Sequence, residues 1–205
     1  MVKTKKNKRT LWITLGVIGV IILLLVLIVI GSYNGLVTKD ETVDEKWANV
    51  QTAYQRRADL IPNLVDTVQA AVQFEQETQT QIAAVRTSAV AAKQAMSAAT
   101  TPAEVSAASA QVESAVAGFS GLNINVENYP ELKATENFLS LQDELAGTEN
   151  RIKVERDIFN KAVKEYNLKV RRFPSNIFAN MFGFEKKEMF EADEGTATAP
   201  TNLFE

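Results

Sequence analysis

Residues 11–30 form an uncharged run dominated by leucine, isoleucine and valine, the longest apolar stretch in the chain. At about 1.5 Å per residue, a helix of this length spans roughly 30 Å, the thickness of a bilayer's hydrocarbon core. The run is apolar on every side, unlike the helices of a soluble core. It is also longer than the apolar region of about 7–15 residues in a cleavable signal peptide. The pattern predicts an uncleaved transmembrane signal anchor at residues 11–31.

The charges that flank this run predict its orientation. Five cations precede it: Lys3, Lys5, Lys6, Lys8 and Arg9. By the positive-inside rule, residues 1–10 stay in the cytoplasm and the remaining chain is extracytoplasmic. We therefore expect a single-pass protein of the cell membrane whose first partner is the lipid bilayer.

Two helical patterns follow the anchor, on either side of Pro62. The first helix is indicated by the apolar positions Val43, Trp47, Val50, Tyr54, Ala58 and Ile61. The second is indicated by Leu64, Val65, Val68, Val72, Ile82, Val85, Ala89 and Met96. Proline in a helix interior removes a hydrogen bond, and Asp59 could cap a new helix. The apolar phase nevertheless passes Pro62 without a slip, so the sequence leaves a turn and a kink both open.

A third, alanine-rich helix is predicted after Thr101. Thr101 and Glu104 have the spacing of a capping box, with Pro102 at the first helical position. Its inward positions are Val105, Ala108, Val112, Val116 and Phe119, and it should end between Gly118 and Gly121. Residues 122–130 are predicted to form a loop.

The fourth predicted helix, residues 131–172, carries a sustained heptad stripe. Its members are Phe138, Leu145, Ile152, Phe159, Tyr166 and Phe173. Such a stripe requires partner helices packed at shallow angles. Pro174 should end this helix, a phenylalanine-rich stretch follows, and residues 191–205 are predicted to be a disordered acidic tail.

Charge and composition exclude several classes of function. The formal charge is −3 and the first nine residues carry +5, which leaves −8 for the rest of the chain and argues against nucleic acid as a partner. Cysteine and histidine are both absent. Disulfides, Cys/His zinc sites, Ser-His triads and the Glu-x-x-His di-metal centres of helical bundles are therefore excluded. We expect no catalytic, cofactor-binding or metal-binding residues. The acidic residues Glu41, Asp44, Glu45, Glu75 and Glu77 are interpreted as solvated.

Polar residues within the predicted helices are the remaining site candidates. One group lies at the junction near Pro62: Arg56, Arg57, Asp59 and Asn63. A second group lies along the fourth helix: Gln142, Glu149, Asn150, Asn160 and Asn167. They could form a ligand or partner site, or they could cap helices, fix register and face water.

Several motifs follow one another in order along the chain: Tyr33-Asn34, Leu36-Val37, Glu45, Trp47, YQRRADLIPNLV (54–65), YPELKA (129–134), FLSLQDELAGTENRI (138–152), Tyr166-Asn167, FPSNIFA (173–179) and FGF (182–184). Together these motifs resemble the LemA family. The resemblance implies an all-α fold in which one membrane span precedes an up-and-down antiparallel four-helix bundle with long helices, here residues 32–190. It implies no reaction and no catalytic residues.

Three functions are compatible with these observations. The first is a membrane-anchored structural or scaffolding protein of the cell envelope that forms homo-oligomers. Small residues available for self-contact include Ala83, Ala84, Ala91, Ala92, Ala107 and Ala110. The second is an accessory or adaptor subunit for another envelope membrane protein, such as a protease or transporter. The third is an envelope hydrolase that uses carboxylates alone.

The choice at Pro62 has a consequence for the phenylalanine-rich stretch. With a turn there, four helical passes bring Arg171, Arg172 and residues 177–184 back to the bilayer, near Tyr33. The aromatic side chains would then enter the lipid interface or close the base of the core. With only a kink, the first two helices form one rod and the fourth ends far from the lipid.

Overall fold

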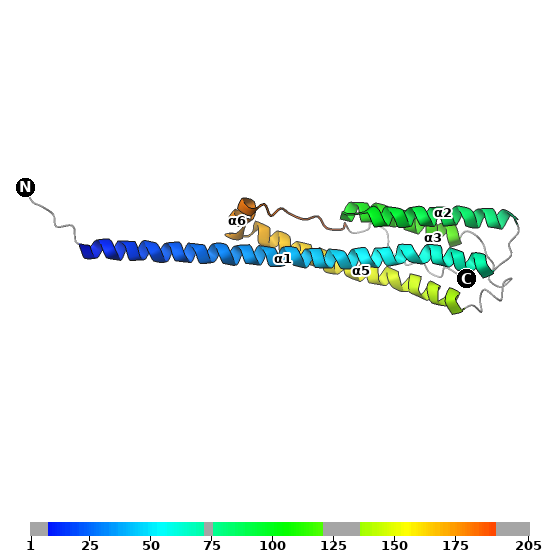
Figure 1. Cartoon of the computed structure of the whole chain (residues 1–205), viewed down its shortest axis with the longest axis horizontal. Coiled ribbons are helices and arrows are strands. Elements are labelled where there is room, and N and C mark those ends of the chain that lie inside the picture. Colours follow the sequence, from blue (N-terminus) through cyan, green and yellow to red (C-terminus); the bar gives the residue numbers. More distant parts are fainter. Residues whose placement is uncertain (1–7, 72–75, 121–135, 192–205) are drawn as a thin grey trace, which may run out of the picture. The chain divides into compact units, whose positions relative to one another are not determined.

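The computed structural model describes residues 8–71, 76–120 and 136–191 of the 205-residue chain (Figure 1). The described residues form helices α1 (Lys8–Ala71), α2 (Gln76–Ala98), α3 (Pro102–Ser120), α5 (Glu136–Arg171) and α6 (Ser175–Phe182), with no strand among them. The all-α prediction is confirmed. The predicted loop at 122–130, the cations before Lys8, and all but Glu191 of the predicted tail lie outside the described residues.

The chain divides into two compact units. The first consists of Met1–Val43 and Lys164–Lys187, and the second of Asp44–Val163 and Glu188–Glu205. Both α1 and α5 contribute residues to each unit. The membrane-type segment and α6 belong to the first unit, whereas α2 and α3 belong to the second.

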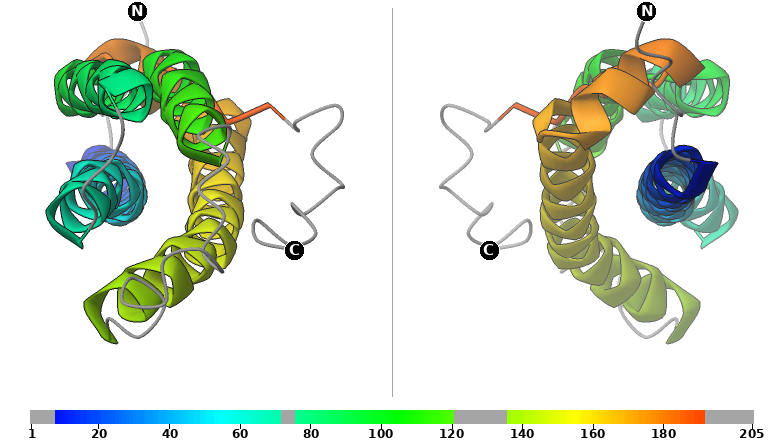
Figure 2. Two further views of the ribbon diagram at one scale, coloured as in Figure 1. Left: turned by 90° about the vertical axis from the view of Figure 1, so that its right-hand side faces the viewer. Right: turned by 90° about the vertical axis from the view of Figure 1, so that its left-hand side faces the viewer.

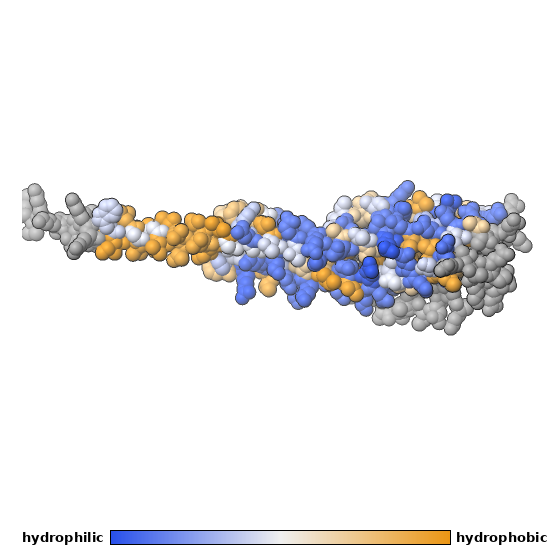
Figure 3. All heavy atoms as spheres, turned by 60° about the horizontal axis from the view of Figure 1, so that its bottom comes forward, coloured by the Kyte–Doolittle hydropathy of each residue, from blue (hydrophilic) through white to orange (hydrophobic). Residues whose placement is uncertain are grey.

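The first part of α1 exposes its apolar side chains, which appear as a continuous hydrophobic surface on the face shown in Figure 3. Its leucine, isoleucine and valine side chains from Leu11 to Ile30 are almost all about half exposed, and no other part of the described chain covers them. Among the described residues, α1 is the one helix long and apolar enough to cross a membrane. Exposed apolar surface of this extent is rare on proteins surrounded by water.

In the first unit, α1 and the end of α5 lie in close contact. A Cβ built on Gly35 of α1 would lie 3.1 Å from Lys169 Cε, so a larger residue would force this side chain to move. An ion pair joins Lys39 Nζ to Glu165 Oε2 at 2.7 Å. Leu36, Tyr166 and Val170 are buried. After α5, the chain forms α6, for which the sequence analysis predicted no helix.

The second unit is an antiparallel helical bundle. Ion pairs join Asp59 to Lys93 and Asp66 to Arg86. Because the later residue of α1 pairs with the earlier residue of α2, the two helices are antiparallel. Trp47 packs on Phe159 while Arg56 pairs with Glu144, which gives α5 the same antiparallel direction relative to α1. Figure 2, viewed along the helices, shows α2 and α3 side by side, and they contact one another extensively. The predicted up-and-down four-helix bundle is confirmed.

The helix that contains Pro62 continues past it, but it does not include the whole of the predicted second helix. Helix α1 continues through Pro62 to Ala71, and α2 begins at Gln76. Leu64, Val65 and Val68 therefore belong to α1, whereas the apolar residues from Ile82 onward belong to α2; Val72 lies outside the described residues. The missing hydrogen bond at Pro62 is tolerated because apolar side chains on both sides of it, Ile61 and Leu64 among them, are buried.

This continuous helix corrects two predictions. Asp59 lies in the interior of α1 and is not an N-cap. The expectation that a helix continuing past Pro62 would form a rod and leave the end of α5 far from the lipid is also wrong. The helix ends nine residues after Pro62, and the end of α5 lies against Gly35, just past the apolar segment.

The heptad stripe of α5 is confirmed except at its last member. Phe138, Leu145, Ile152, Phe159 and Tyr166 are all buried. Phe173 is 76% exposed because α5 ends at Arg171, so the helical phase no longer applies to it. Five of the six alanines considered for self-contact are exposed, but Ala92 is buried.

The capping box of α3 is confirmed. The Thr101 N–H donates to Glu104 Oε2 at 3.1 Å, and the Glu104 N–H donates to Thr101 Oγ1 at 3.2 Å. The Thr100 N–H donates to the same carboxylate at 2.8 Å. These hydrogen bonds lower the pKa of Glu104 below its ordinary value of 4.5, and the bonds from Thr100 have the largest effect. The cap therefore stabilises α3 fully at a pH above the ordinary pKa of a glutamate carboxyl group. This contribution is lost as the pH falls through the lowered pKa of Glu104.

Candidate functional site

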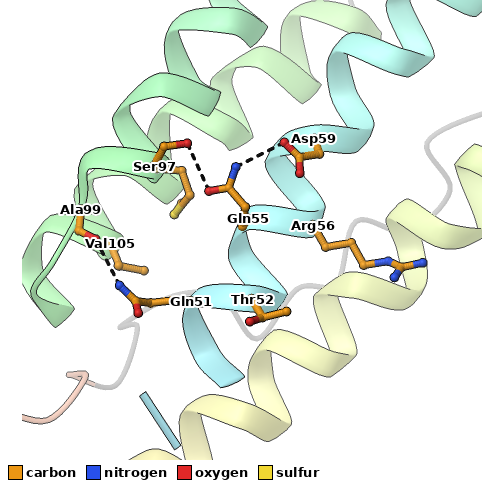
Figure 4. A pocket seen from close by; sticks show the side chains of 9 residues that line it. Gln51, Thr52, Gln55, Arg56, Asp59, Ser97, Ala99 and Val105 are labelled. Carbon is orange, nitrogen blue, oxygen red and sulfur yellow. Dashed lines mark hydrogen bonds between the residues drawn. The ribbon is translucent and has the colours of Figure 1, made fainter. Parts of the chain in front are cut away.

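An open groove of about 520 Å³ lies between α1, α2 and the start of α3 in the second unit (Figure 4). It is lined by Gln51, Thr52, Gln55, Arg56, Asp59, Met96, Ser97, Ala99 and Val105. Two of the predicted site candidates, Arg56 and Asp59, are among these residues. The groove is the place where a ligand site built on the first candidate group would lie.

The polar side chains of the groove bind one another across the helices. Gln55 Nε2 donates to Asp59 Oδ1 at 3.2 Å, and Ser97 Oγ donates to Gln55 Oε1 at 3.3 Å (Figure 4). Gln51 Nε2 donates to the carbonyl oxygen of Ala99 at 3.4 Å. Asp59 also pairs with Lys93 of α2 at 3.0 Å. The Ser97–Gln55 and Asp59–Lys93 contacts join α1 to α2, and Gln51 joins α1 to the residue just after α2, so the polar groups of the groove already bind one another.

The two arginines of the candidate group point to different helices. Arg56 points away from the groove toward α5, where it pairs with Glu144 (Figure 4). The side chain of Arg57 is only 10% exposed and pairs with Glu113 of α3 at 2.9 Å. Arg57 Nε has no hydrogen-bond partner among the described residues. The two side chains thus connect α1 to α5 and to α3.

The carboxylate of Glu113 is perturbed by its surroundings. Desolvation raises its pKa above 4.5; the positive charge of Arg57 opposes this, and the negative charge of Glu149 adds to it. A raised carboxyl pKa gives a contribution to stability that is present at low pH and is lost as the pH rises through the raised value. Glu149, another site candidate, therefore acts on the Arg57–Glu113 pair through its charge.

The remaining candidates in the second unit do not converge on the groove. Asn63 and Asn150 are exposed, on α1 and α5 respectively. Gln142 lines a small, mainly apolar cavity with Ile61, Leu64, Val116, Phe119, Ser120 and Leu145. The structure therefore does not assemble the candidate residues into one polar site.

Asn160 binds the backbone of the C-terminal segment (residues 183–191). Its Nδ2 donates to the carbonyl oxygen of Phe190 at 3.0 Å, and the Phe190 N–H donates to its Oδ1 at 2.9 Å. In the first unit, Asn167 makes the same paired contact with Lys187, at 2.8 and 2.9 Å. Because both ends of each amide are used, each asparagine fixes the backbone N–H and C=O of one residue, Phe190 or Lys187.

Phe190 fills an aromatic cluster that the sequence analysis did not identify. Its ring centroid lies 5.9 Å from that of Trp47, 5.7 Å from Phe159 and 6.3 Å from Tyr54. The guanidinium carbon of Arg156 lies 4.9 Å from the centre of its ring. Phe190 itself is only 4% exposed. The C-terminal segment therefore completes the core of the bundle at this level.

A second aromatic cluster lies in the first unit, just past the apolar segment of α1. The ring of Tyr33 lies 5.0 Å from Phe182 and 6.0 Å from Phe184, both edge to face. Lys187 pairs with Asp40 at 2.7 Å, and its Nζ lies 5.5 Å from the ring centre of Tyr166. The phenylalanine-rich stretch therefore lies near Tyr33, as expected for four helical passes, although the turn at Pro62 on which that expectation rested does not form.

No group of three acidic side chains that could hold a metal ion occurs within residues 8–71, 76–120 and 136–191. Glu41, Asp44 and Glu45 are exposed on α1, and Glu45 pairs with Lys46 at 2.7 Å. Glu75 and Glu77 lie where side chains are not described.

Comparisons with known proteins give the chain a family. It is similar to magnetosome proteins MamQ 1 and MamQ 2 of Paramagnetospirillum magneticum (strain ATCC 700264 / AMB-1), at 30% identity over 66 residues in each case. These matches cover 32% of this chain and 24% of each relative, so the similarity spans about a quarter of their length. The LemA family model matches residues 46–204. Since this match covers most of the chain, the protein belongs to the LemA family.

Proposed function

We propose that the protein is a single-pass, membrane-anchored scaffold of the cell envelope. The observation that carries the proposal is the continuity of α1, which contains both the exposed apolar segment and the first helix of the bundle. A bilayer would cover the apolar segment, and the bundle would then be held at the membrane surface. The LemA family and the names of the magnetosome relatives assign no reaction to such a protein.

The engaged polar residues support a structural role. Arg56, Arg57 and Asp59 join α1 to three other helices through ion pairs. The pair made by the buried Arg57 side chain is the one that contributes most to fixing which helix faces meet, because the other two pairs are largely exposed to solvent. A scaffold would use the outer surfaces of the bundle to contact other molecules. On α2 and α3 these surfaces include Val90 and the exposed alanines Ala83, Ala84, Ala91, Ala107 and Ala110.

Self-association is the expected form of this scaffold. Small exposed side chains allow helices of neighbouring copies to approach closely, and symmetric homo-oligomers are the commonest assemblies. The purified protein in mild detergent should elute as an oligomer with light-scattering mass above that of one 22.6 kDa chain plus bound detergent. Cross-linking in native membranes should give the same species. A monomer in both experiments would contradict this prediction.

An adaptor for another envelope membrane protein, such as a protease or transporter, is the second candidate. It uses the same anchor and differs only in what contacts the bundle. Pull-down from native membranes distinguishes them: copies of this chain alone indicate a scaffold, and a distinct membrane protein in fixed ratio indicates an adaptor. A hydrolase based on carboxylates is the third candidate, and hydrolytic turnover that survives purification would indicate it.

The orientation of the anchor is a separate prediction. A reporter active only outside the cytoplasm, fused after Glu205, should be active, because the five cations before the apolar segment hold the N-terminus inside. Neutral residues at Lys3, Lys5, Lys6, Lys8 and Arg9 should reduce this signal. Activity of a cytoplasm-only reporter at the same position would contradict the proposed topology.

A further inference from the structure

Helix α6 buries small residues and exposes large apolar ones, which is the reverse of the usual arrangement in a helix at a protein–water surface. Its buried residues are Ser175 and Ala179, which are small. Three of its four large apolar residues are exposed, Ile177 at 54%, Met181 at 61% and Phe182 at 44%, and the fourth, Phe178, is half-buried. Since an exposed patch of this kind is unfavourable in water, something apolar is expected to cover it.

The exposed face extends beyond α6. Ile177 and Met181 are four residues apart in α6, and Phe173, between α5 and α6, is 76% exposed. Leu168, in the last turn of α5, is 60% exposed. These four side chains and Phe182 together form what we call the α6 patch.

The α6 patch lies where α1 would leave a bilayer. Phe182 packs edge to face on Tyr33, at 5.0 Å between ring centroids. Tyr33 is three residues past Ile30, the last residue of the apolar segment, so it lies about 4.5 Å farther along the helix axis. Aromatic residues at this depth occupy the membrane interface. The patch is thus continuous with the surface that lipid would already cover.

The charges around the α6 patch suit anionic lipid. Residues 168–187 contain five cations, Lys169, Arg171, Arg172, Lys186 and Lys187, of which Lys187 pairs with Asp40, and one carboxylate, Glu185, although the chain as a whole has a charge of −3. Arg171, Arg172 and Lys186 are exposed. Each cation near an anionic membrane surface adds to the attraction between the protein and the membrane.

We infer that α6 is an interfacial helix that inserts the α6 patch into the outer leaflet while the neighbouring arginines contact anionic headgroups. The bilayer is the occupant because the patch adjoins the apolar segment of α1 and carries the charge of a lipid-binding surface. The inference rests on the proposed membrane anchor and adds a second point of contact. Two contacts would restrict the tilt and rotation of the first unit at the membrane.

Site-specific labelling tests this inference directly. The chain contains no cysteine, so Met181→Cys gives a single site for an environment-sensitive fluorophore in the full-length protein. The protein is placed in nanodiscs of phosphatidylcholine and phosphatidylglycerol whose acyl chains are brominated near the headgroup. Most of the Met181 label's emission should be quenched. A label at Lys164→Cys, an exposed position on α5 in the same unit, should keep its emission.

A third label separates this inference from the proposed anchor. A fluorophore at Ile22→Cys, within the apolar segment, should be quenched by lipids brominated deep in the acyl chain if α1 spans the bilayer. Quenching at Ile22 without quenching at Met181 would overturn the α6 inference alone. No quenching at Ile22 would overturn the anchor as well.

Two further conditions identify the occupant and the role of charge. Quenching at Met181 should persist in discs that hold one chain each; its loss there would show that a second copy covers the patch and would overturn the inference. Arg171→Gln combined with Arg172→Gln should reduce the quenching in mixed lipid more than in phosphatidylcholine alone. An equal effect in both lipids would overturn the assignment of anionic headgroups.

Discussion

Replacing Phe159 with alanine is expected to lower the free energy of unfolding of the bundle by about 3–5 kcal/mol. The Phe159 side chain is 3% exposed and lies at the centre of the α5 stripe. Its ring packs on Trp47 at 5.3 Å and on Phe190 at 5.7 Å, so the substitution removes contacts with both. A loss of this size is a large share of the roughly 5–15 kcal/mol that stabilises a typical domain. Denaturant unfolding of the full chain in mild detergent, followed by circular dichroism, measures it.

Lys161 is the matched control for Phe159. It lies two residues farther along the same helix and is exposed. Lys161→Ala should change the free energy of unfolding by less than about 0.5 kcal/mol, because it removes no buried surface. Equal losses for the two variants would show that the inward face of α5 has been assigned incorrectly.

Periodicity predicted most of the bundle because burial acts on whole helix faces. Five of the six residues in the α5 stripe are buried, as are all five predicted inward positions of α3. The capping box also forms as expected, since it depends on residues only three apart. These features are local or repetitive, so the sequence contains all the information that they require.

The division between the first two bundle helices was wrong because a local rule competed with burial. Proline disfavours a helix interior, but Ile61, Leu64 and Val65 gain their buried positions only if the helix continues past Pro62. The segment between α1 and α2, residues 72–75, contains neither glycine nor proline. No residue there marks the end of the helix, so the sequence offered no signal at the right place.

The roles of Asn160 and Asn167 depend on chain segments far away in sequence. Each asparagine binds the backbone of a residue twenty or more positions later. Backbone groups are present at every residue, so the sequence does not identify which peptide an asparagine will bind. A helpful signal was the position of both asparagines directly after members of the stripe, Phe159 and Tyr166, at the edge of a buried face.

The phenylalanine-rich stretch was predicted to meet the membrane interface or to close the core. Within this stretch the structure buries Ser175 and Ala179, and leaves Phe178 and Phe184 half-buried and Phe182 exposed, so its phenylalanines do not close the core. The aromatic residue that enters the core of the bundle is Phe190, beyond the stretch. Aromatic content alone could not distinguish these positions, because the path of the chain after Gly183 decides which rings reach the core.

Gly183 sets that path. It has φ 78°, in the left-handed region that glycine adopts readily, and its N–H donates to the carbonyl oxygen of Ala179. The Phe184 N–H donates to the same carbonyl at 2.9 Å. This end of α6 directs the chain into the C-terminal segment, whose peptide groups Asn167 and Asn160 then bind.

Phe190→Ala is expected to destabilise the bundle by about 3 kcal/mol and to expose Trp47 to water. The Phe190 ring is 4% exposed and contacts Trp47, Tyr54 and Phe159, so its removal opens the cluster on the side of the C-terminal segment. Trp47 emission should shift to longer wavelength, measured in a Trp12→Phe background because the chain has two tryptophans. Met189→Ala, one residue earlier and 46% exposed, should leave both stability and emission nearly unchanged. An unshifted emission for Phe190→Ala, or equal effects of the two variants, would show that the C-terminal segment does not complete the core.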